Sequence, residues 1–261
     1  MDSKKMVVAI IQARMSSSRL PGKVLEEIGE REMLGWVVER VSRAEKVDKV
    51  VVATTKKEED EAIVEFCAQQ GYPCHRGSEF DVLDRFYQAA KEWKADMVVR
   101  ITADCPFIDP EVIDKTLAAF FKAKSEANFA ANRLPPPWKR TYPVGLDTEV
   151  VGFKTLEDVW LKADESHQRE HVMPYIYEHP DQFKIVLINS EKDYSDLRWT
   201  VDTKDDLRLV REIAGNFEGR EDFSWKEIIE LYQRKPALKE INADVQQKKA
   251  HDVDKRMGYM R

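Results

Sequence analysis

Short runs of β-branched and other apolar residues alternate with amphipathic stretches through the first part of the chain. This pattern predicts buried strands at 7–11, 49–54 and 96–102, with helices at 33–44, 58–70 and 80–93. Strands that alternate with helices of this length form crossover units. The chain is therefore predicted to be an α/β protein with a Rossmann-like, mostly parallel sheet and helices on both faces. A ligand is expected beyond the carboxyl ends of the strands.

The pattern loosens after Phe121, and the Pro135-Pro136-Pro137-Trp138 stretch is typical of a stiff extended connector. A small elaboration of the main sheet is expected over about residues 133–172. Strands are predicted at 144–151, 183–188 and 198–201, and helices at 153–164 and 170–177. Residues 225–261 are predicted to form a charged helical tail, because 242–257 has too few apolar residues for a core. We therefore expect a main domain of residues 1–224 followed by this tail.

Composition and charge narrow the class of protein. The 43% hydrophobic content is that of a globular protein, and the net charge of −6 argues against a nucleic acid or an anionic membrane as partner. No apolar run approaches the roughly 18 residues of a spanning helix, and the start of the chain does not resemble a secretory signal. Cys67, Cys74 and Cys105 show no Cys-x-x-Cys spacing. These features predict a cytoplasmic protein without a disulfide framework or a structural zinc site.

A basic loop directly follows the first predicted strand. The segment 12–23 contains the cations Arg14, Arg19 and Lys23, three consecutive serines and a Pro-Gly turn, and it contains no acid. Such a loop offers amide, hydroxyl and cationic donors to a polyphosphate. It has neither the Walker spacing nor the Gly-x-Gly-x-x-Gly spacing of a dinucleotide loop. A triphosphate-binding loop is predicted, and an ordinary solvated basic loop is the alternative.

Two aspartates follow predicted strands in the same way. Asp104 comes after the strand at 96–102, and Asp202 comes after the one at 198–201. Carboxylates from two strand ends can chelate one magnesium ion and leave room for phosphate oxygens and water. The alternative for Asp104 is a turn cap, and for Asp109 a helix cap is the better interpretation.

These segments together resemble the sugar-acid cytidylyltransferases, a group with the nucleotide-diphospho-sugar transferase fold. The loop ending Arg19-Leu-Pro-Gly-Lys23 is similar to that group's phosphate loop, and Thr102-Ala-Asp-Cys-Pro106 to the Gln-Gly-Asp-Glu-Pro of 3-deoxy-manno-octulosonate cytidylyltransferases. Val201-Asp-Thr203 with Asp206-Leu207 is similar to their Val-Asp-Thr-x-x-Asp-Leu. The spore-coat polysaccharide biosynthesis branch is matched best, because segments 77–79, 81–85 and 169–172 also resemble it. The resemblance spans roughly residues 6–210.

The resemblance implies a magnesium-dependent enzyme that joins CMP from CTP to a keto-sugar acid for surface polysaccharide, with release of pyrophosphate. It implies that Arg14, Arg19 and Lys23 bind the triphosphate and that Asp104 and Asp202 bind Mg²⁺. The implied catalytic residues are Arg14, Arg19, Lys23 and Asp104. The residues implied to bind the nucleotide are Gln12, Ala13, Arg14, Arg76, Gly77, Ser78, Arg85 and Thr102. Cys105 and Thr102 depart from the glutamate and glutamine of the octulosonate enzymes, which leaves the base and the number of metal ions open.

The acceptor sugar is expected near the predicted strand at 144–151. Asp147 and Glu149 occupy alternate positions there, and therefore share one face of the strand. Together with Arg169 and His171 they are the candidates for substrate binding. Cations that would pair with the carboxylate of a sugar acid are Arg133, Lys139, Arg140 and Arg169. A homodimer is a further expectation from the resemblance.

Three other functions stay open from the sequence. The run from His167 to His171 matches the His-x-x-Glu-His pattern of inverted zinc peptidases, although a third ligand is not evident. A nucleotide-binding module without catalysis would keep the same basic loop and aspartates. A uridylyl- or guanylyltransferase acting on a sugar 1-phosphate is the alternative within the enzyme class.

Overall fold

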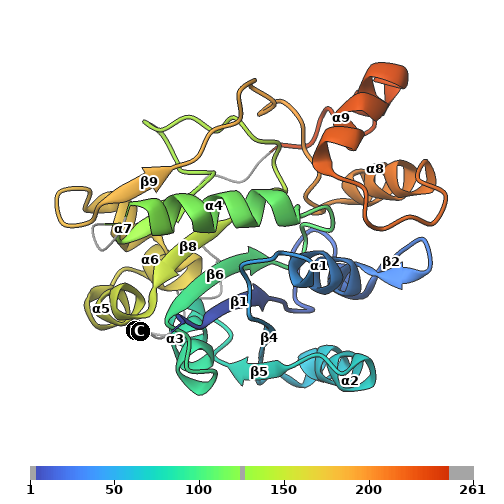
Figure 1. Cartoon of the computed structure of the whole chain (residues 1–261). Helices are drawn as coiled ribbons and strands as arrows, with labels where there is room; N and C mark the ends of the chain where they lie inside the picture. Colours follow the sequence, from blue (N-terminus) through green and yellow to red (C-terminus); the bar gives the residue numbers. More distant parts are fainter. Residues whose placement is uncertain (1–3, 124–126, 247–261) are drawn as a thin grey trace.

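The computed structural model describes residues 4–123 and 127–246, and its centre is one seven-stranded sheet (Figure 1). The strand order is β5-β4-β1-β6-β8-β7-β9. The strands are β1 (Val7–Gln12), β4 (Lys49–Thr55), β5 (Cys74–Gly77), β6 (Met97–Thr102), β7 (Phe129–Ala131), β8 (Glu149–Gly152) and β9 (Ile185–Leu187). Strands β5, β4, β1 and β6 are parallel, whereas β8 is antiparallel to both of its neighbours. The predicted mostly parallel α/β sheet is confirmed.

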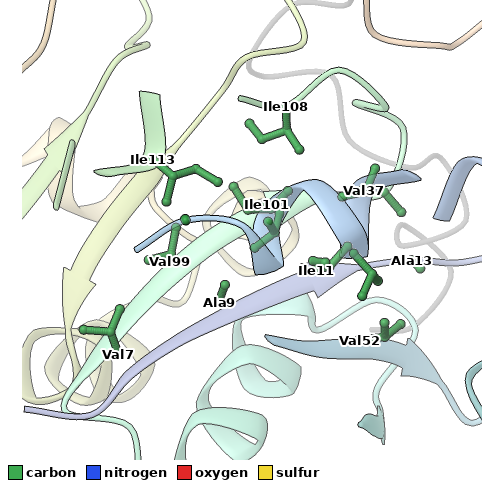
Figure 2. Packing of buried hydrophobic residues seen from close by; sticks show 14 of the residues in the cluster. Val7, Ala9, Ile11, Ala13, Val37, Val52, Val99, Ile101, Ile108 and Ile113 are labelled. Carbon is green, nitrogen blue, oxygen red and sulfur yellow. The ribbon is translucent and has the colours of Figure 1, made fainter. Parts of the chain in front are cut away.

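Helices cover both faces of the sheet because the inner strands point apolar side chains to both faces in alternation. On one face Val7, Ala9 and Ile11 of β1 pack with Val99 and Ile101 of β6 (Figure 2). This face is covered by α1 (Met33–Ser42), α2 (Glu61–Gln70) and α4 (Pro110–Lys122). The other face is covered by α3 (Val82–Glu92), α5 (Phe153–Lys162) and α7 (Pro174–Glu178), and α6 (Ser166–His171) packs against α3.

A third apolar cluster lies beyond the carboxyl end of the parallel strands and holds α8 (Lys204–Gly215) and α9 (Trp225–Arg234). Figure 1 shows both helices at the opposite end of the molecule from β9 and α5. Trp199 is fully buried in this cluster and donates its indole N–H to the hydroxyl of Tyr232 on α9. The packing fixes the chain around Trp199 at the edge where β1 and β6 end.

Helix α9 begins the predicted charged tail, yet one face of it is core. Trp225, Ile228, Leu231 and Tyr232 are buried in the third cluster. The division of the chain at residue 224 stays a prediction, and residues 247–261 of the predicted tail lie outside the described residues. Within the expected elaboration at 133–172, β8, α5 and α6 belong to the main sheet and its covering layer.

Two predicted strands are wrong in extent. The strand at 144–151 is only β8, and the strand at 198–201 does not form beyond one isolated bridge between Val144 and Arg198. Gly145 explains the interruption, because it has a φ of +110° and a Cβ there would lie 2.7 Å from the backbone nitrogen of Thr200. The chain turns at this close approach instead of extending a ladder.

The predicted helix at 170–177 is instead two short helices, α6 and α7. Val172 between them has a φ of +72° and a ψ of −53°, and the N–H of Met173 bonds to the carbonyl of His171 in a tight turn that ends α6. Pro174 opens α7. β7 and the small hairpin of β2 (Glu27–Ile28) and β3 (Arg31–Glu32) were not predicted from the sequence. No helix in the described part of the chain has the length and apolar character needed to cross a bilayer.

Candidate functional site

The basic loop after β1 is held at both ends by hydrogen bonds. Ala13 donates its backbone N–H to the carbonyl of Ala53, and Met15 donates its own to the carboxylate of the fully buried Asp60, at 2.6 Å. Gly22, with a φ of +76°, returns its N–H to the carbonyl of Met15. The loop therefore presents its cations at the carboxyl edge of the sheet. Nothing in the sequence pattern indicated the role of Asp60.

Lys23 joins the two aspartates that the sequence predicted to meet. Its Nζ donates to Asp104 Oδ2 at 2.7 Å, to Asp202 Oδ1 at 2.9 Å and to the carbonyl of Val201 at 2.7 Å. The Lys23 side chain is only 9% exposed. Val201 in turn donates its N–H to the carbonyl of Asp104, which ties the end of β6 to the chain before α8. Three segments distant in sequence thus converge.

Asp202 is surrounded by cations. Its Oδ2 lies 2.7 Å from Arg19 Nη2 and 2.6 Å from Arg198 Nη2, while Oδ1 accepts from Lys23. Burial would raise the pKa of Asp202, but the charges and hydrogen bonds of Lys23, Arg19 and Arg198 outweigh it and lower the pKa to about 2. Asp202 is therefore ionised across the physiological range.

Arg198 is a site residue that the sequence analysis missed. Besides Asp202, its Nε donates to Asp206 Oδ1 at 3.1 Å. The other oxygen of Asp206 accepts the backbone N–H groups of Asp202 and Thr203, each at 3.0 Å. Thr203 also caps α8 through the N–H of Asp206, as a helix-start residue does. These contacts hold the Asp202 carboxylate in place without a regular strand.

The Lys23 ammonium is held in its charged form. Burial would lower the pKa of Lys23, but the Asp104 and Asp202 carboxylates together outweigh it and raise the pKa above its ordinary value.

Asp109 follows Asp104 in the segment after β6. It caps α4 by accepting from the N–H groups of Glu111 and Val112, which confirms the capping interpretation.

The donor set at Asp104 and Asp202 suits magnesium arriving with a nucleotide. Among residues 4–123 and 127–246, no group of three or more His, Cys, Asp or Glu side chains is placed to hold a metal ion. Proteins commonly bind Mg²⁺ through only one or two carboxylates, and phosphate oxygens and water complete the shell. Two aspartates from different elements, with hard oxygen donors, are consistent with that arrangement.

Gly77, Ser78 and Arg85 form a second group at the end of β5. Arg85 on α3 is 1% exposed, and its Nη1 donates to the carbonyl of Ser78 at 2.8 Å. A Cβ at Gly77 would lie 2.8 Å from Arg85 Cγ, so this close approach requires glycine. Burial, and next the nearby Arg14 guanidinium, lowers the pKa of Arg85 to about 10. Arg85 therefore lies close to Arg14 of the basic loop and adds a second positive charge there.

Arg76 lies on the same strand but contacts other groups. Its guanidinium donates to the carbonyls of Thr55 and Lys57 and pairs with Glu61 at 2.6 Å. These contacts brace the turn between β4 and α2. In the structure these contacts occupy the Arg76 guanidinium, and its contact with a nucleotide stays a prediction.

Thr102 and Cys105 follow β6 beside Asp104. The Thr102 hydroxyl lies 3.2 Å from Cys105 Sγ, and burial, followed by the charge of Asp104, raises the pKa of Cys105. Cys105 is accordingly a thiol at neutral pH and does not supply a thiolate nucleophile. Gln12, the last residue of β1, accepts from Arg100 Nε at 3.1 Å.

Three arginines and two acids form a cluster around the start of β8. Arg100 pairs with Glu149, and Arg140 binds both oxygens of Asp147. Arg133 lies 3.8 Å from Asp147 and 4.0 Å from Glu149. Burial would raise the pKa of Asp147, but Arg140 and Arg133 outweigh it and lower the pKa. The five side chains carry one net positive charge, so the cluster can attract an anionic group.

Asp147 precedes β8 and is not in a strand. The prediction that Asp147 and Glu149 share one face of a strand is therefore wrong.

Arg169, by contrast, is a structural clamp. Its Nε and Nη2 bind both oxygens of Asp81, and its Nη1 donates to the carbonyl of Trp160 at 2.7 Å. Asp81 is the N-cap of α3, so Arg169 fastens α6 to the start of that helix. The expected role of Arg169 in substrate binding is not supported by these contacts. Lys139 is exposed.

The two histidines of the His-x-x-Glu-His run lie on α6. His167 Nε2 is 2.7 Å from Glu178 Oε1, and the half-buried His171 ends the helix. The described residues contain no metal group of three such ligands, so the structure does not support the zinc peptidase alternative. The role of His171 in substrate binding stays a prediction.

A family model described as cytidylyltransferase matches residues 8–250 of the chain. The chain belongs to this cytidylyltransferase family. It is 35% identical to the spore coat polysaccharide biosynthesis protein SpsF of Bacillus subtilis, over 91% of this chain and 99% of that protein. A solved cytidylyltransferase structure from Leptospira borgpetersenii superposes with a TM-score of 0.85 at 31% identity, covering 94% of this chain and 99% of that one.

A more local likeness connects the cytidylyltransferase to sugar-acid enzymes. The 3-deoxy-manno-octulosonate cytidylyltransferase of Pelobacter propionicus is 36% identical over 42% of this chain and 43% of its own length. Because that match covers less than half of each chain, it bears on the shared motifs and not on the acceptor of this enzyme. Family and fold together establish a transferase enzyme of the cytidylyltransferase class.

Proposed function

We propose that this enzyme transfers CMP from CTP to a keto-sugar acid in a magnesium-dependent reaction that yields a CMP-sugar and pyrophosphate. Surface polysaccharide biosynthesis is the process it would serve. The observation that carries the proposal is the convergence of Lys23, Asp104 and Asp202 beside a basic loop in a cytidylyltransferase fold. The product class rests on the likeness to the spore-coat protein and the octulosonate enzymes.

The nucleotide would lie along the carboxyl edge of β1, β5 and β6. Arg14, Arg19 and Lys23 would donate to the triphosphate, whose negative charge offsets their own. Gly77 and Ser78 would contact the base, and the buried Arg85 would hold the Ser78 carbonyl close by. Gln12, Ala13 and Thr102 line the ends of the same strands. Asp104 and Asp202 would hold Mg²⁺, which, when bound, supplies positive charge to the phosphate oxygens.

The reaction needs no protein nucleophile. An acceptor hydroxyl oxygen attacks the α-phosphorus in line, the bond between that phosphorus and the bridging oxygen breaks, and pyrophosphate leaves. The hydroxyl proton passes to solvent. Once they bind the phosphates, Arg14, Arg19 and Lys23 stabilise the charge that develops on the phosphate oxygens.

The acceptor would lie at the cluster of Arg100, Arg133 and Arg140. Its surplus positive charge is matched to a carboxylate, and a guanidinium binds a carboxylate through two parallel hydrogen bonds. Asp147 and Glu149 orient these arginines and would accept hydrogen bonds from sugar hydroxyls. Arg76 and Arg169 would act as structural residues, through Glu61 and Asp81.

Pyrophosphate release tests the proposed reaction. Purified enzyme with MgCl₂ is offered CTP with a panel of keto-sugar acids, and in parallel UTP or GTP with sugar 1-phosphates. The proposal expects release with CTP and at least one keto-sugar acid. Release only with UTP or GTP and a sugar 1-phosphate would contradict the proposal and favour the alternative transferase class.

Arg140 tests the acceptor site within the same assay. Replacing it in Arg140→Met removes the bidentate partner of Asp147, so we expect the KM for the acceptor to rise about tenfold or more with the KM for CTP little changed. Arg220→Met removes an exposed arginine that pairs with Asp222, and serves as the matched control. Equal effects on both KM values would contradict this assignment.

A further inference from the structure

Lys23 occupies the position between the two carboxylates that the proposed magnesium site requires. A lysine ammonium has three N–H donors. Three acceptors surround this one, namely Asp104 Oδ2 at 2.7 Å, Asp202 Oδ1 at 2.9 Å and the carbonyl of Val201 at 2.7 Å. The hydrogen-bonding capacity of the ammonium is thus filled by the site itself.

A metal ion and this ammonium cannot share the same two oxygens. Magnesium binds carboxylate oxygens at about 2.0–2.1 Å, which would put the ion within about 5 Å of the Lys23 nitrogen if Lys23 stayed in place. Like charges at that separation, in a largely desolvated site, repel strongly. Asp202 also faces Arg19 and Arg198, so the free protein already neutralises it with three cations.

We propose that Lys23 is an internal placeholder for the metal, which makes metal binding conditional on nucleotide binding. In the free enzyme the ammonium neutralises Asp104 and Asp202. The phosphates of an arriving nucleotide draw Lys23 away and leave both carboxylates available to Mg²⁺. This inference rests on the proposed function, because it takes Asp104 and Asp202 as the metal ligands.

The geometry of the side chain permits this exchange. Lysine carries its charge on a flexible four-carbon stem, and Lys23 sits in the same loop as Arg14 and Arg19, the other proposed phosphate ligands. By linkage, whatever factor the nucleotide adds to metal affinity, the metal adds to nucleotide affinity. Lys23 would thereby prevent Mg²⁺ from binding to Asp104 and Asp202 before CTP binds.

Metal binding without nucleotide tests the inference directly. Mn²⁺, as MnCl₂, replaces Mg²⁺ because its binding is followed by electron paramagnetic resonance. We expect Lys23→Met and Lys23→Gln to bind Mn²⁺ at least about tenfold more tightly than the wild type, since the competing charge is gone. Lys23→Arg keeps the charge and is expected to bind as weakly as the wild type. Lys115→Met, which breaks an exposed pair with Glu111, is the matched control and should change nothing.

The outcomes separate this inference from the proposed function. If CTP stabilises the wild type only with MgCl₂ and Asp104→Asn abolishes the effect, the metal site stands. In that case, Lys23→Met and Lys23→Gln variants that bind Mn²⁺ no better than the wild type overturn the placeholder role alone. A wild type that shows no magnesium-dependent stabilisation by CTP overturns both proposals.

Discussion

The Asp202 carboxylate links the charge of the site to the stability of the fold. Burial would raise its pKa, but Lys23, Arg19 and Arg198 lower it to about 2, below the ordinary 3.8. A carboxyl with a lowered folded-state pKa contributes stability that is fully present above about pH 4 and is lost as the pH falls towards 2. A difference of this size corresponds to a contribution on the order of 2 kcal/mol.

Urea denaturation between pH 2.5 and pH 7 measures this contribution. We expect Asp202→Asn to lower the free energy of unfolding at pH 7 and to flatten its decline below about pH 4. Asp205→Asn, which removes an exposed carboxyl three residues away, should follow the wild-type curve. Parallel curves for the wild type and Asp202→Asn would show that the cations do not stabilise the ionised carboxylate.

Gly77 tests the group proposed to contact the base. A Cβ added there would lie 2.8 Å from Arg85 Cγ and 3.3 Å from its Cα, so α3 or the arginine must shift. We expect Gly77→Ala to cost about 1–3 kcal/mol of stability and to weaken CTP binding. Gly152→Ala meets open space and is the control. Thermal denaturation and CTP titration measure both effects, and an unchanged CTP affinity would remove Gly77 and Arg85 from the site.

Among the helices, α9 tests whether the C-terminal segment belongs to the folded body. Ile228 is fully buried in the third apolar cluster, whereas its neighbour Ile229 is half-buried. We expect Ile228→Ala to cost about 2–5 kcal/mol and Ile229→Ala clearly less. Urea denaturation gives both values. Equal and small costs would mean that α9 is the loosely attached tail that its charge suggested.

The strands and helices that the sequence predicted well all have a clear local pattern of hydrophobic residues. β1, β4 and β6 each contain a short apolar run buried between the two layers of helices, and α1, α2 and α3 carry apolar residues at helical spacing. β7 has three residues, too few for a periodic pattern. The chain at 198–202 looks like a strand but is held by the Asp206 carboxylate and one bridge. Such side-chain contacts leave no periodic signal in the sequence.

The same contrast explains which site residues were predictable. Lys23, Asp104 and Asp202 follow predicted strands or lie in the loop after one, and strand ends meet at one edge of a parallel sheet. Asp60 was missed because its partner, the backbone N–H of Met15, lies in a distant segment. Arg198 was missed although Asp202 and Asp206 follow closely in the sequence, because the irregular backbone that brings them together has no periodic pattern. A sequence motif also does not show which carboxylate an arginine pairs with. Arg169 was predicted to bind substrate, and it pairs with Asp81.

Across the molecule, charge is distributed unevenly. The chain carries a net charge of −6, yet the loop after β1 presents Arg14, Arg19 and Lys23 where the parallel strands end. This local surplus suits an anionic nucleotide while the overall charge disfavours nucleic acid. A homodimer and a cytoplasmic location stay predictions from the resemblance and from the sequence.

The central claim is a site that binds CTP together with magnesium. A thermal-shift panel of CTP, UTP, GTP, ATP and dTTP, each with and without MgCl₂, tests it on the wild type and on Asp104→Asn. We predict stabilisation by CTP that exceeds the other nucleotides, requires magnesium and is lost in the variant, because Asp104 would hold the ion. No shift with any nucleotide, or an equal shift without magnesium in both proteins, would contradict the account.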